Sequence, residues 1–441
     1  MKSKLPSYLA NAKPCPQNER SPWYVCIAPI YIGIFLWFVF WEGIINTGSV
    51  GGVLNYGIWL PLGTIVVIGV LSYILFYYVP AVFGLKTGYS LTIVGSPLFG
   101  QVGGILMPGL LMAFLQFGWL AINVYFSSKL ICSVITFIPF WLMIIIEGAF
   151  ATFIGLKGIK YVAKVSTYLP MIPFAILLIL LFSTFGGVAN FDESIFVGEN
   201  KMSPISTIEF MVCYVIGFFA TAGAAGADFA SNARNMADVH KGGFVGVFLG
   251  IVLTAVASLL IVAGAYGNPE TAKAMLEAGA PTNTTSVMNF VMGSKVGGIM
   301  MLLLTVAAFP SACFASVIAS DVFKAAMPKV NANLSVSIGG IIATLLALSG
   351  IAGELISIMT FFAGSFAPIV GAMCAEYIIA KGEWKPAGES INKSGWLAWA
   401  IGFAVGVAPN FDVEVPFASL VAFVVGFIVY FVCEKISRRK I

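Results

Sequence analysis

The sequence predicts an all-α polytopic membrane protein with twelve transmembrane helices. Hydrophobic residues make up 59% of the 441 residues and charged residues only 10%, and the mean hydropathy is +0.98. These values lie far outside those of a soluble globular domain. The single histidine argues against a histidine metal site, and the seven cysteines, which form no CxxC pair, are typical of packing residues.

Twelve apolar stretches are candidates to cross the hydrocarbon core, which takes about 20 helical residues, although the eleventh is short. The first 22 residues are polar, so we expect no cleavable signal peptide. The predicted spans cover residues 23–46, 56–83, 103–131, 133–155, 162–185, 207–230, 242–266, 296–325, 333–350, 354–380, 395–410 and 416–433.

The placement of Lys and Arg predicts that both termini are cytoplasmic. With the N-terminus inside, only Lys129, Lys201, Lys273 and Lys295 of the 23 Lys and Arg residues lie on the outer side. An excess of Lys and Arg marks the cytoplasmic segments of a membrane protein. We therefore expect a multi-pass protein of the cell (cytoplasmic) membrane.

The first ten spans can be divided into two sets of five, at residues 23–186 and 207–381, although the sequence similarity between the two sets is too weak to establish a repeat. Because five is odd, a second five-helix repeat must be inverted relative to the first, an arrangement common in secondary transporters. The remaining predicted segments are an N-terminal tail at 1–22, an outer connection at 187–206, two further helices within 394–434 and a C-terminal tail at 435–441.

Span 6 contains a candidate interruption between Gly217 and Arg234. Phe218 and Phe219 lead into residues 220–226, where every side chain is small. Irregular backbone at membrane depth is tolerated where it lines a cavity, and transporters use half-helix ends there to hold substrates and ions. A close helix-packing seam is the alternative, because small residues also let helices approach.

Counting inward from the span ends, at about 1.5 Å per residue, places several polar and aromatic side chains near the membrane midplane. Polar side chains at that depth tend to face a protein interior or a cavity. Aromatic rings with amides and hydroxyls but no fixed charge suit a flat, neutral, polar molecule, whereas helix packing is the alternative. The candidate substrate residues are Gln116, Trp119, Asn123, Phe219, Thr221, Ser311 and Phe366.

Three motifs resemble those of the nucleobase–cation symporter-1 family, the purine–cytosine permease group. Span 3 has Gln116-Phe117-Gly118-Trp119, which is similar to the family's Q-x-G-W element. Span 6 has Phe219 ahead of Ala227-Asp228-Phe229, which resembles an aromatic residue followed by [PA]-D-[FY]. The end of span 10, from Pro368 to Tyr377, is similar to P-x-x-G-x-M-x-x-D-Y, with Glu376 in place of the Asp.

The resemblance implies a five-plus-five inverted repeat, like that of the leucine transporter, with two additional helices. It also implies import of a base by alternating access, often together with sodium. By this resemblance Gln116 and Trp119 contact the base, Phe219 stacks opposite Trp119, and Thr221 supplies a polar contact. Asn123 sits where some members carry a substrate amide.

The coupling ion is expected to be Na⁺ or H⁺, and no other cofactor or metal is expected. The resemblance implies sodium ligands from span-8 hydroxyls and span-1 backbone carbonyls, so the candidates are Gly33, Thr305 and Ser311. The tandem hydroxyls of many members are not evident at the centre of span 8. Sodium coupling therefore stays open.

Four membrane acids are candidates for proton coupling or gating, because burying a carboxylate in a membrane is costly. Glu147 in span 4 lies most deeply, and Glu42 lies near the outer end of span 1. Asp228 and Glu376 lie toward the cytoplasmic end, where we expect ion pairs with Arg234 or a nearby lysine.

The sequence therefore predicts a secondary transporter, not an enzyme, that imports a nucleobase or a similar planar heterocycle. A hydantoin, allantoin or a pyrimidine vitamin precursor is the alternative substrate. A nucleotide-driven pump, a channel and an intramembrane enzyme lack support, because no Walker loop, potassium-filter motif, or clustered nucleophile or metal-ligand set is present. The expected partners are the small molecule and the lipid bilayer, without nucleic acid, in a monomer or weak oligomer.

Overall fold

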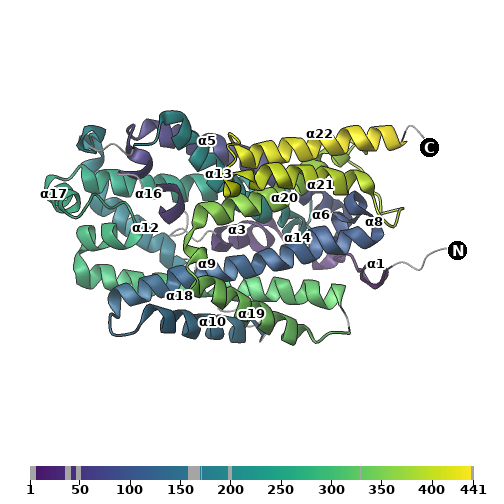
Figure 1. Cartoon of the computed structure of the whole chain (residues 1–441), viewed down its shortest axis with the longest axis horizontal. Helices are drawn as coiled ribbons and strands as arrows, with labels where there is room; N and C mark the ends of the chain where they lie inside the picture. The colour runs from purple at the N-terminus through teal and green to yellow at the C-terminus, as the bar shows by residue number, and fades with distance from the viewer. Residues whose placement is uncertain are drawn as a thin grey trace.

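A computed structural model describes residues 6–34, 41–45, 51–156, 169, 171–196, 201–327 and 329–438. Within these residues the secondary structure is helical, with two isolated β-bridges and no strand. The long helices run along one axis, and both termini lie at the same end of the molecule (Figure 1). The predicted all-α class is confirmed.

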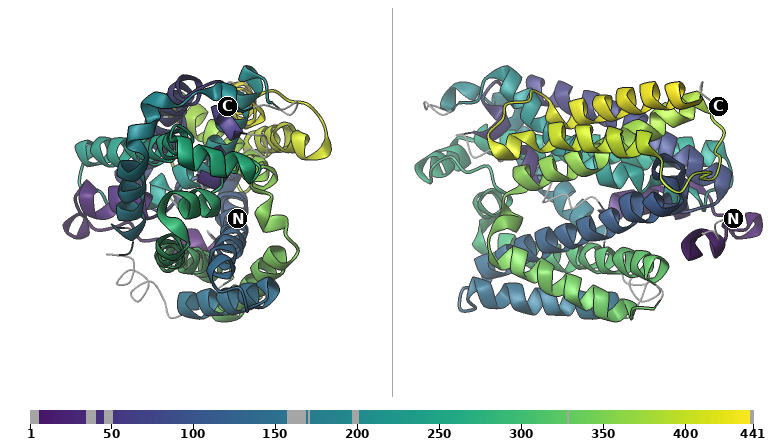
Figure 2. Two further views of the ribbon diagram at one scale, coloured as in Figure 1. Left: turned by 90° about the vertical axis from the view of Figure 1, so that its left-hand side faces the viewer. Right: turned by 45° about the vertical axis from the view of Figure 1, so that its right-hand side comes forward.

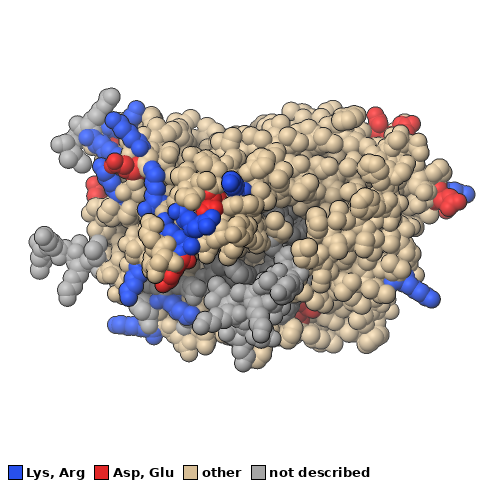
Figure 3. Space-filling view, turned by 180° about the vertical axis from the view of Figure 1, so that it is seen from behind, with Lys and Arg blue, Asp and Glu red and all other residues tan. Residues whose placement is uncertain are grey.

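Charged side chains are distributed unevenly along this axis. Lys and Arg side chains gather at the end that carries both termini, which is the left end in Figure 3. Only a few charged side chains lie at the opposite end, and much of the surface between the two ends is uncharged. This distribution is typical of helices that cross a bilayer with their basic ends in the cytoplasm.

Eight helical stretches in the described part of the chain are long and apolar enough to cross a membrane. The remaining predicted spans coincide with shorter apolar helices at Trp23–Ile32, Phe140–Ile154 and Asn333–Leu348 and with α21 (Lys393–Val407). Each predicted span thus overlaps a helix, while the count of twelve crossings stays a prediction. The eight long stretches are Trp59–Thr87, Ser96–Val134, Met171–Asn190, Pro204–Ala230, Met236–Tyr266, Thr284–Val306, Leu355–Ile379 and Ala418–Arg438.

Two predicted boundaries were wrong. The junction of spans 3 and 4 lies further along the chain, because α9 (Leu111–Val134) continues through the polar residues and α10 (Phe140–Leu156) begins only after Pro139. A proline is well suited to start a helix, since it has no N–H to donate. The helix of span 8, α18 (Thr284–Ala326), begins well before the predicted residue 296 and bends at Gly293, where φ is +76°.

Helices of spans 1, 2, 6 and 7 contact one another and form a first group. They are α3 (Ala28–Ile34), α5 (Trp59–Leu71), α13 (Pro204–Ala224) and α16 (Gly250–Tyr266). In this group α13 also packs extensively on α20 (Leu355–Ile379). The helices of spans 3, 4, 8 and 9 form a second group, which consists of α9, α10, α18 and α19 (Ala332–Leu348). The second group makes a separate layer, at the bottom of Figure 1 and of the right-hand view in Figure 2.

The second group has a tight seam between α10 and α19. Gly148 and Thr152 of α10 face Gly340 and Thr344 of α19, and each threonine packs where the partner glycine lacks a β-carbon. Each hydroxyl also donates to the carbonyl of the glycine in its own helix, at 2.7 Å from Thr152 and 2.8 Å from Thr344. Small residues of this kind let membrane helices approach closely.

Helix α20 (Leu355–Ile379) connects the first group to the C-terminal helices. It packs on α13, on α21 and on α22 (Ala418–Arg438). Gly402 of α21 and Gly426 of α22 both lie against Pro368 within α20, so the three helices approach closely there.

Span 6 is interrupted where the sequence predicts it. Helix α13 ends at Ala224, and α14 (Gly226–Ala230) follows after a single residue, Ala225. Helical bonding restarts at that residue, because the backbone N–H groups of Asp228 and Phe229 both donate to the Ala225 carbonyl. In span 1, α3 is followed by residues 35–40, which lie outside the described residues, and by the π-helix η2 (Trp41–Ile45).

Candidate functional site

An aromatic cluster lies where α9 of the second group meets α13 of the first. The indole of Trp119 meets the ring of Phe218 edge-on, with centroids 4.9 Å apart, and the ring of Phe362 from α20 at 5.1 Å. This geometry is the one that aromatic pairs prefer. Both phenylalanines are buried, whereas Trp119 keeps part of its surface exposed. The cluster therefore presents an indole at the boundary between the two helix groups.

Trp119 is also joined to α13 by a hydrogen bond. Its indole Nε1 donates to Oγ1 of Thr221 over 3.3 Å, and the buried Thr221 hydroxyl donates to the Phe218 carbonyl over 3.1 Å. The structure thus brings together two of the predicted substrate residues from spans that are about a hundred residues apart. The site therefore combines an aromatic face with a hydroxyl group.

The other aromatic residues are arranged differently from the sequence expectation. The ring beside Trp119 belongs to Phe218, while the predicted stacking residue Phe219 is fully buried and packs on Phe218 at 5.3 Å. Adjacent helical residues point about 100° apart, so an error of one residue changes the face. Phe362 was missed. Its position one turn before the predicted Phe366, which is fully buried, would have indicated it.

Two buried oxygen atoms, on residues about one helical turn along the chain from Trp119 and Phe362, lack a hydrogen-bond partner among the described residues. Asn123 donates its Nδ2 to the Trp119 carbonyl over 2.8 Å, which leaves its Oδ1 buried and free. Oγ of Ser365, beside Phe366 in α20, is in the same state. Buried acceptors and donors without partners are costly, so a ligand with its own polar edge would gain contacts here. The predicted Gln116 donates to the sulfur of Met112 at 3.4 Å.

The proposed sodium ligands are only partly described. Thr305 is buried in α18, and its hydroxyl donates to the Met301 carbonyl of the same helix over 3.1 Å. Ser311 belongs to α18 and Gly33 to α3, but the side-chain surroundings of both lie outside the described part. The described residues contain no group of three or more His, Cys, Asp or Glu that could hold a metal ion.

Two of the membrane acids accept hydrogen bonds from the beginnings of other helices. The N–H of Thr284, the first residue of α18, donates to Glu42 Oε1 over 2.8 Å. The N–H of Leu91, at the start of the short helix α7 (Leu91–Val94), donates to Asp228 Oδ1 over 2.8 Å. A carboxylate at a helix N-terminus satisfies a free N–H and complements the helix dipole. Both acids therefore tie separate spans together.

The ion pairs expected for the cytoplasmic acids were wrong in their partners. Arg234 pairs at 2.9 Å with Asp238, four residues further along the chain. Glu376 pairs instead with Arg438 at the end of α22, at 2.7 and 2.9 Å, and accepts from the Tyr430 hydroxyl over 3.1 Å. Arg234 lies just before α15 (Met236–Gly243), whose first turn carries Asp238, whereas the Arg438 contact depends on how α22 packs.

A sequence profile for permeases for cytosine/purines, uracil, thiamine and allantoin matches residues 14–432. The chain belongs to this permease family. The resemblance noted in the sequence is thereby confirmed, and the permease is a multi-pass membrane transporter rather than an enzyme. No curated protein sequence matches it.

The permease shares its fold with solved transporters at low sequence identity. The inward-facing structure of Mhp1 gives a TM-score of 0.74 at 16% identity, covering 98% of this chain and 94% of that one. Mhp1 in a closed conformation with bromovinylhydantoin bound, described as a nucleobase-cation-symport-1 family transporter, gives 0.65 at 16%, covering 100% and 95%. A Na⁺-coupled sialic acid symporter in an outward-open state gives 0.64 at 12%, covering 99% and 93%.

Glu147 differs from the other three candidate acids of the permease. It lies half-buried on the face of α10 that also carries the buried Ile144, Gly148 and Ala151. Within the described part of the chain it has no hydrogen-bond or ion-pair partner. A lone carboxyl group next to the tight α10–α19 seam is a candidate to bind a proton or another cation.

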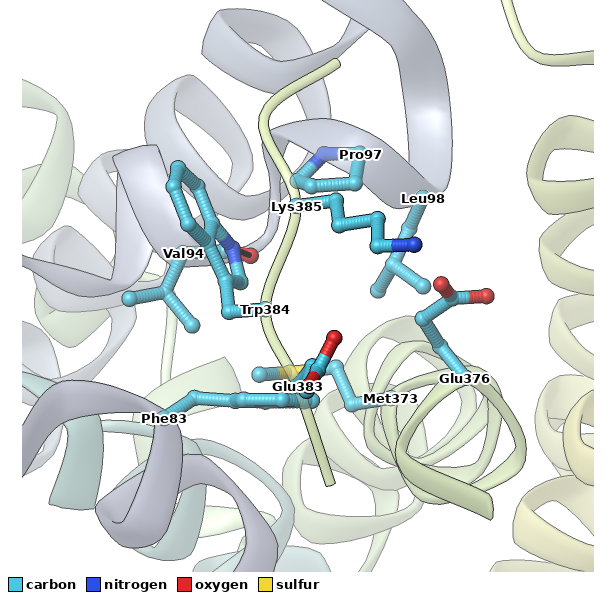
Figure 4. Close-up of a pocket in the computed structure, with 9 residues that line it drawn as sticks. All are labelled: Phe83, Val94, Pro97, Leu98, Met373, Glu376, Glu383, Trp384 and Lys385. Carbon is cyan, nitrogen blue, oxygen red and sulfur yellow. Dashed lines mark hydrogen bonds between the residues drawn. The ribbon is translucent and has the colours of Figure 1, made fainter. Parts of the chain in front are cut away.

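Figure 4 shows a small pocket lined in part by Glu376, the partner of Arg438 near the C-terminus of the permease. Its Glu376 is fourteen residues beyond Phe362 on α20, about 21 Å along the helix, so the pocket is separate from the aromatic cluster. It has room for about one water molecule. It is therefore not a site for a heterocycle. Its lining comprises Phe83, Val94, Pro97, Leu98, Met373, Glu376, Glu383, Trp384 and Lys385.

Proposed function

We propose that the permease imports a nucleobase or a similar neutral, planar heterocycle, which it binds at the Trp119 cluster. The observation that carries this proposal is the partly exposed indole of Trp119, which donates a hydrogen bond to Thr221 at the boundary between the two helix groups. Stacking on an aromatic side chain contributes about 1–3 kcal/mol per base in proteins that bind single-stranded nucleic acids. The same contact suits a free base.

The polar groups around the cluster favour a substrate without charge. Gln116, Asn123 and Ser365 offer amide and hydroxyl groups, and two of these side chains carry free buried oxygens. Three of the four candidate membrane acids are held by partners elsewhere, and Glu147 lies beside the α10–α19 seam, so we expect a cation such as thiamine to bind poorly at the cluster. A base edge with N–H and carbonyl groups would satisfy the free atoms.

Hydantoins and allantoin are the alternative substrates. One of the similar structures, Mhp1, was solved with bromovinylhydantoin bound, and the family description includes allantoin. These rings share the planar shape and the adjacent carbonyl and N–H groups of uracil, so the same indole and amide contacts would serve them. A pyrimidine vitamin precursor belongs to the same group.

We further propose that transport occurs by alternating access, with relative movement of the two helix groups. The cluster joins the two helix groups through a few side chains, those of Trp119, Thr221 and Phe218. A small rotation of one group relative to the other would therefore open the cluster to one side of the membrane. Na⁺ or H⁺ would supply the energy. The basic end in Figure 3 supports a location in the cell membrane with both termini in the cytoplasm.

The test is thermal stabilisation of the purified permease by a panel of heterocycles, with and without sodium. The panel contains cytosine, uracil, adenine, guanine, hypoxanthine, allantoin, a hydantoin and thiamine. We expect neutral bases or hydantoins to raise the melting temperature, and thiamine to have no effect. Saturable, concentrative uptake of the stabilising compound into proteoliposomes would separate a carrier from a channel. Absence of a shift with every neutral heterocycle would contradict the proposal.

A further inference from the structure

The interruption of span 6 is held by a tyrosine from span 1. Tyr31 is fully buried in α3, and its hydroxyl donates to the carbonyl of Ala222 over 2.9 Å. In an unbroken α-helix that carbonyl would accept from the N–H of Gly226, four residues later. The helix stops at Ala224, and Tyr31 supplies the missing donor. A buried carbonyl without a donor would be costly.

The position of the Tyr31 hydroxyl is fixed by packing on both sides of the interruption. Its ring meets that of Tyr77 from span 2 at 5.6 Å and that of Phe229 from α14 at 5.2 Å, both edge-on. Gly226 packs against both Tyr31 and Tyr77. A β-carbon there would stand 3.1 Å from the Tyr31 oxygen and 2.9 Å from the Tyr77 ring. The tyrosine therefore has little freedom to move away from Ala222.

The hydrogen bond from Tyr31 to Ala222 lies one residue from the candidate substrate site. Ala222 directly follows Thr221, whose hydroxyl accepts the indole N–H of Trp119. Because Thr221 lies in the last turn of α13, the position of the Ala222 carbonyl also sets the position of the Thr221 side chain. We propose that Tyr31 is a positioning residue, which holds the interrupted part of span 6 so that Thr221 reaches Trp119. The proposal rests on the proposed function, because it assumes that this cluster binds the substrate.

The variant Tyr31→Phe tests this, since it keeps the ring and removes only the hydroxyl. Tyr77→Phe is a matched control, because Tyr77 is equally buried and its hydroxyl also donates to a backbone carbonyl, that of Val239, over 2.9 Å. We expect Tyr31→Phe to raise the dissociation constant of the best stabilising base by about 3- to 10-fold, the effect of one hydrogen bond. Tyr77→Phe should change it less than about 2-fold.

A double variant separates positioning from general loss of structure. If Tyr31 acts through Thr221, then Tyr31→Phe should add little to the weaker binding of Thr221→Val, because coupled residues are not additive. Additive losses would overturn the proposal, as would equal losses in Tyr31→Phe and Tyr77→Phe. Should Tyr31→Phe fail to fold, Gly226→Ala crowds the same hydroxyl and is expected to weaken binding in the same direction. Unchanged binding in a folded Gly226→Ala would then overturn it.

Amide hydrogen exchange provides a readout that does not need a ligand. We expect Tyr31→Phe to speed exchange in a peptide covering residues 217–230, and Tyr77→Phe to leave that peptide unchanged. If no heterocycle binds the wild-type permease but this difference appears, the proposed function fails while Tyr31 still holds the interruption. If binding is normal and exchange is the same in both variants, the positioning role fails and the proposed function stands.

Discussion

Thr344 of α19 fills the space beside Gly148 of α10 that a β-carbon would occupy. The relationship is reciprocal, because Thr152 of α10 stands in the same way beside Gly340 of α19. Both helices carry the same G-x-x-A-T pattern at this place, at residues 148–152 and 340–344. Spans 4 and 9 are the fourth helices of the two predicted repeats. A symmetric contact between them supports the inverted repeat, which stays a prediction.

The seam predicts a specific stability defect. Gly148→Ala places a methyl group against the Thr344 hydroxyl, and overpacking of this kind costs about 1–3 kcal/mol of unfolding free energy. Adding Thr344→Ala should restore part of the loss, since it removes the atoms that clash. Thermal unfolding in detergent is the measurement. Gly63→Ala in α5 is the control, because an added β-carbon there meets nothing within 4 Å. A double variant as unstable as Gly148→Ala would contradict the packing.

Trp119 is expected to dominate substrate binding. Trp119→Ala removes both the stacking face and the donor to Thr221, so we expect the dissociation constant to rise by about 5- to 100-fold. Trp119→Phe keeps an aromatic face, so its dissociation constant should lie between those of the wild type and Trp119→Ala. Trp59→Ala, at a tryptophan that is 82% exposed, serves as the control and should bind normally. Affinity that survives Trp119→Ala would place the site elsewhere.

Thr221 contributes through one hydroxyl. Thr221→Val preserves the shape of the side chain and removes the acceptor of the Trp119 indole, so we expect binding to weaken by about 3- to 10-fold. Thr207→Val is a matched control in the same helix, where the buried hydroxyl donates only to the Ser203 carbonyl, over 3.0 Å. Equal binding by the two variants would show that the Thr221 hydroxyl is not part of the site.

Much of the arrangement could be predicted from local sequence. That Trp119 and Thr221 lie at the same level could be predicted, because the depth of each can be counted from the ends of its own span. The interruption at Ala225 follows from the run of small residues before it. Which of Phe218 and Phe219 packs on Trp119 could not be predicted, since it depends on how α13 is rotated about its axis. The partner of Glu42 was equally hidden, because Thr284 lies 242 residues away in the chain.

Glu147 gives the sharpest prediction about coupling. The other candidate acids accept from a helix N-terminus or pair with Arg438, whereas Glu147 stands without a partner in the described residues. An unpaired carboxyl group in the membrane is held most easily as the neutral acid, so a proton bound there could be exchanged as the helix groups move. If a protonophore abolishes uptake by the wild-type permease, we expect Glu147→Gln to abolish concentrative uptake as well.

The same variant should still exchange substrate across the membrane, because Gln resembles the protonated acid and leaves the Trp119 cluster unchanged. Counterflow of labelled base in proteoliposomes measures this exchange separately from proton-driven accumulation. Glu277→Gln, at the exposed last residue of α17 (Pro269–Glu277), is the control and should accumulate substrate normally. Accumulation by Glu147→Gln that still collapses with a protonophore would move the proton to another group. Accumulation that follows a sodium gradient instead would show that sodium is the coupling ion and that Glu147 does not carry the coupling proton.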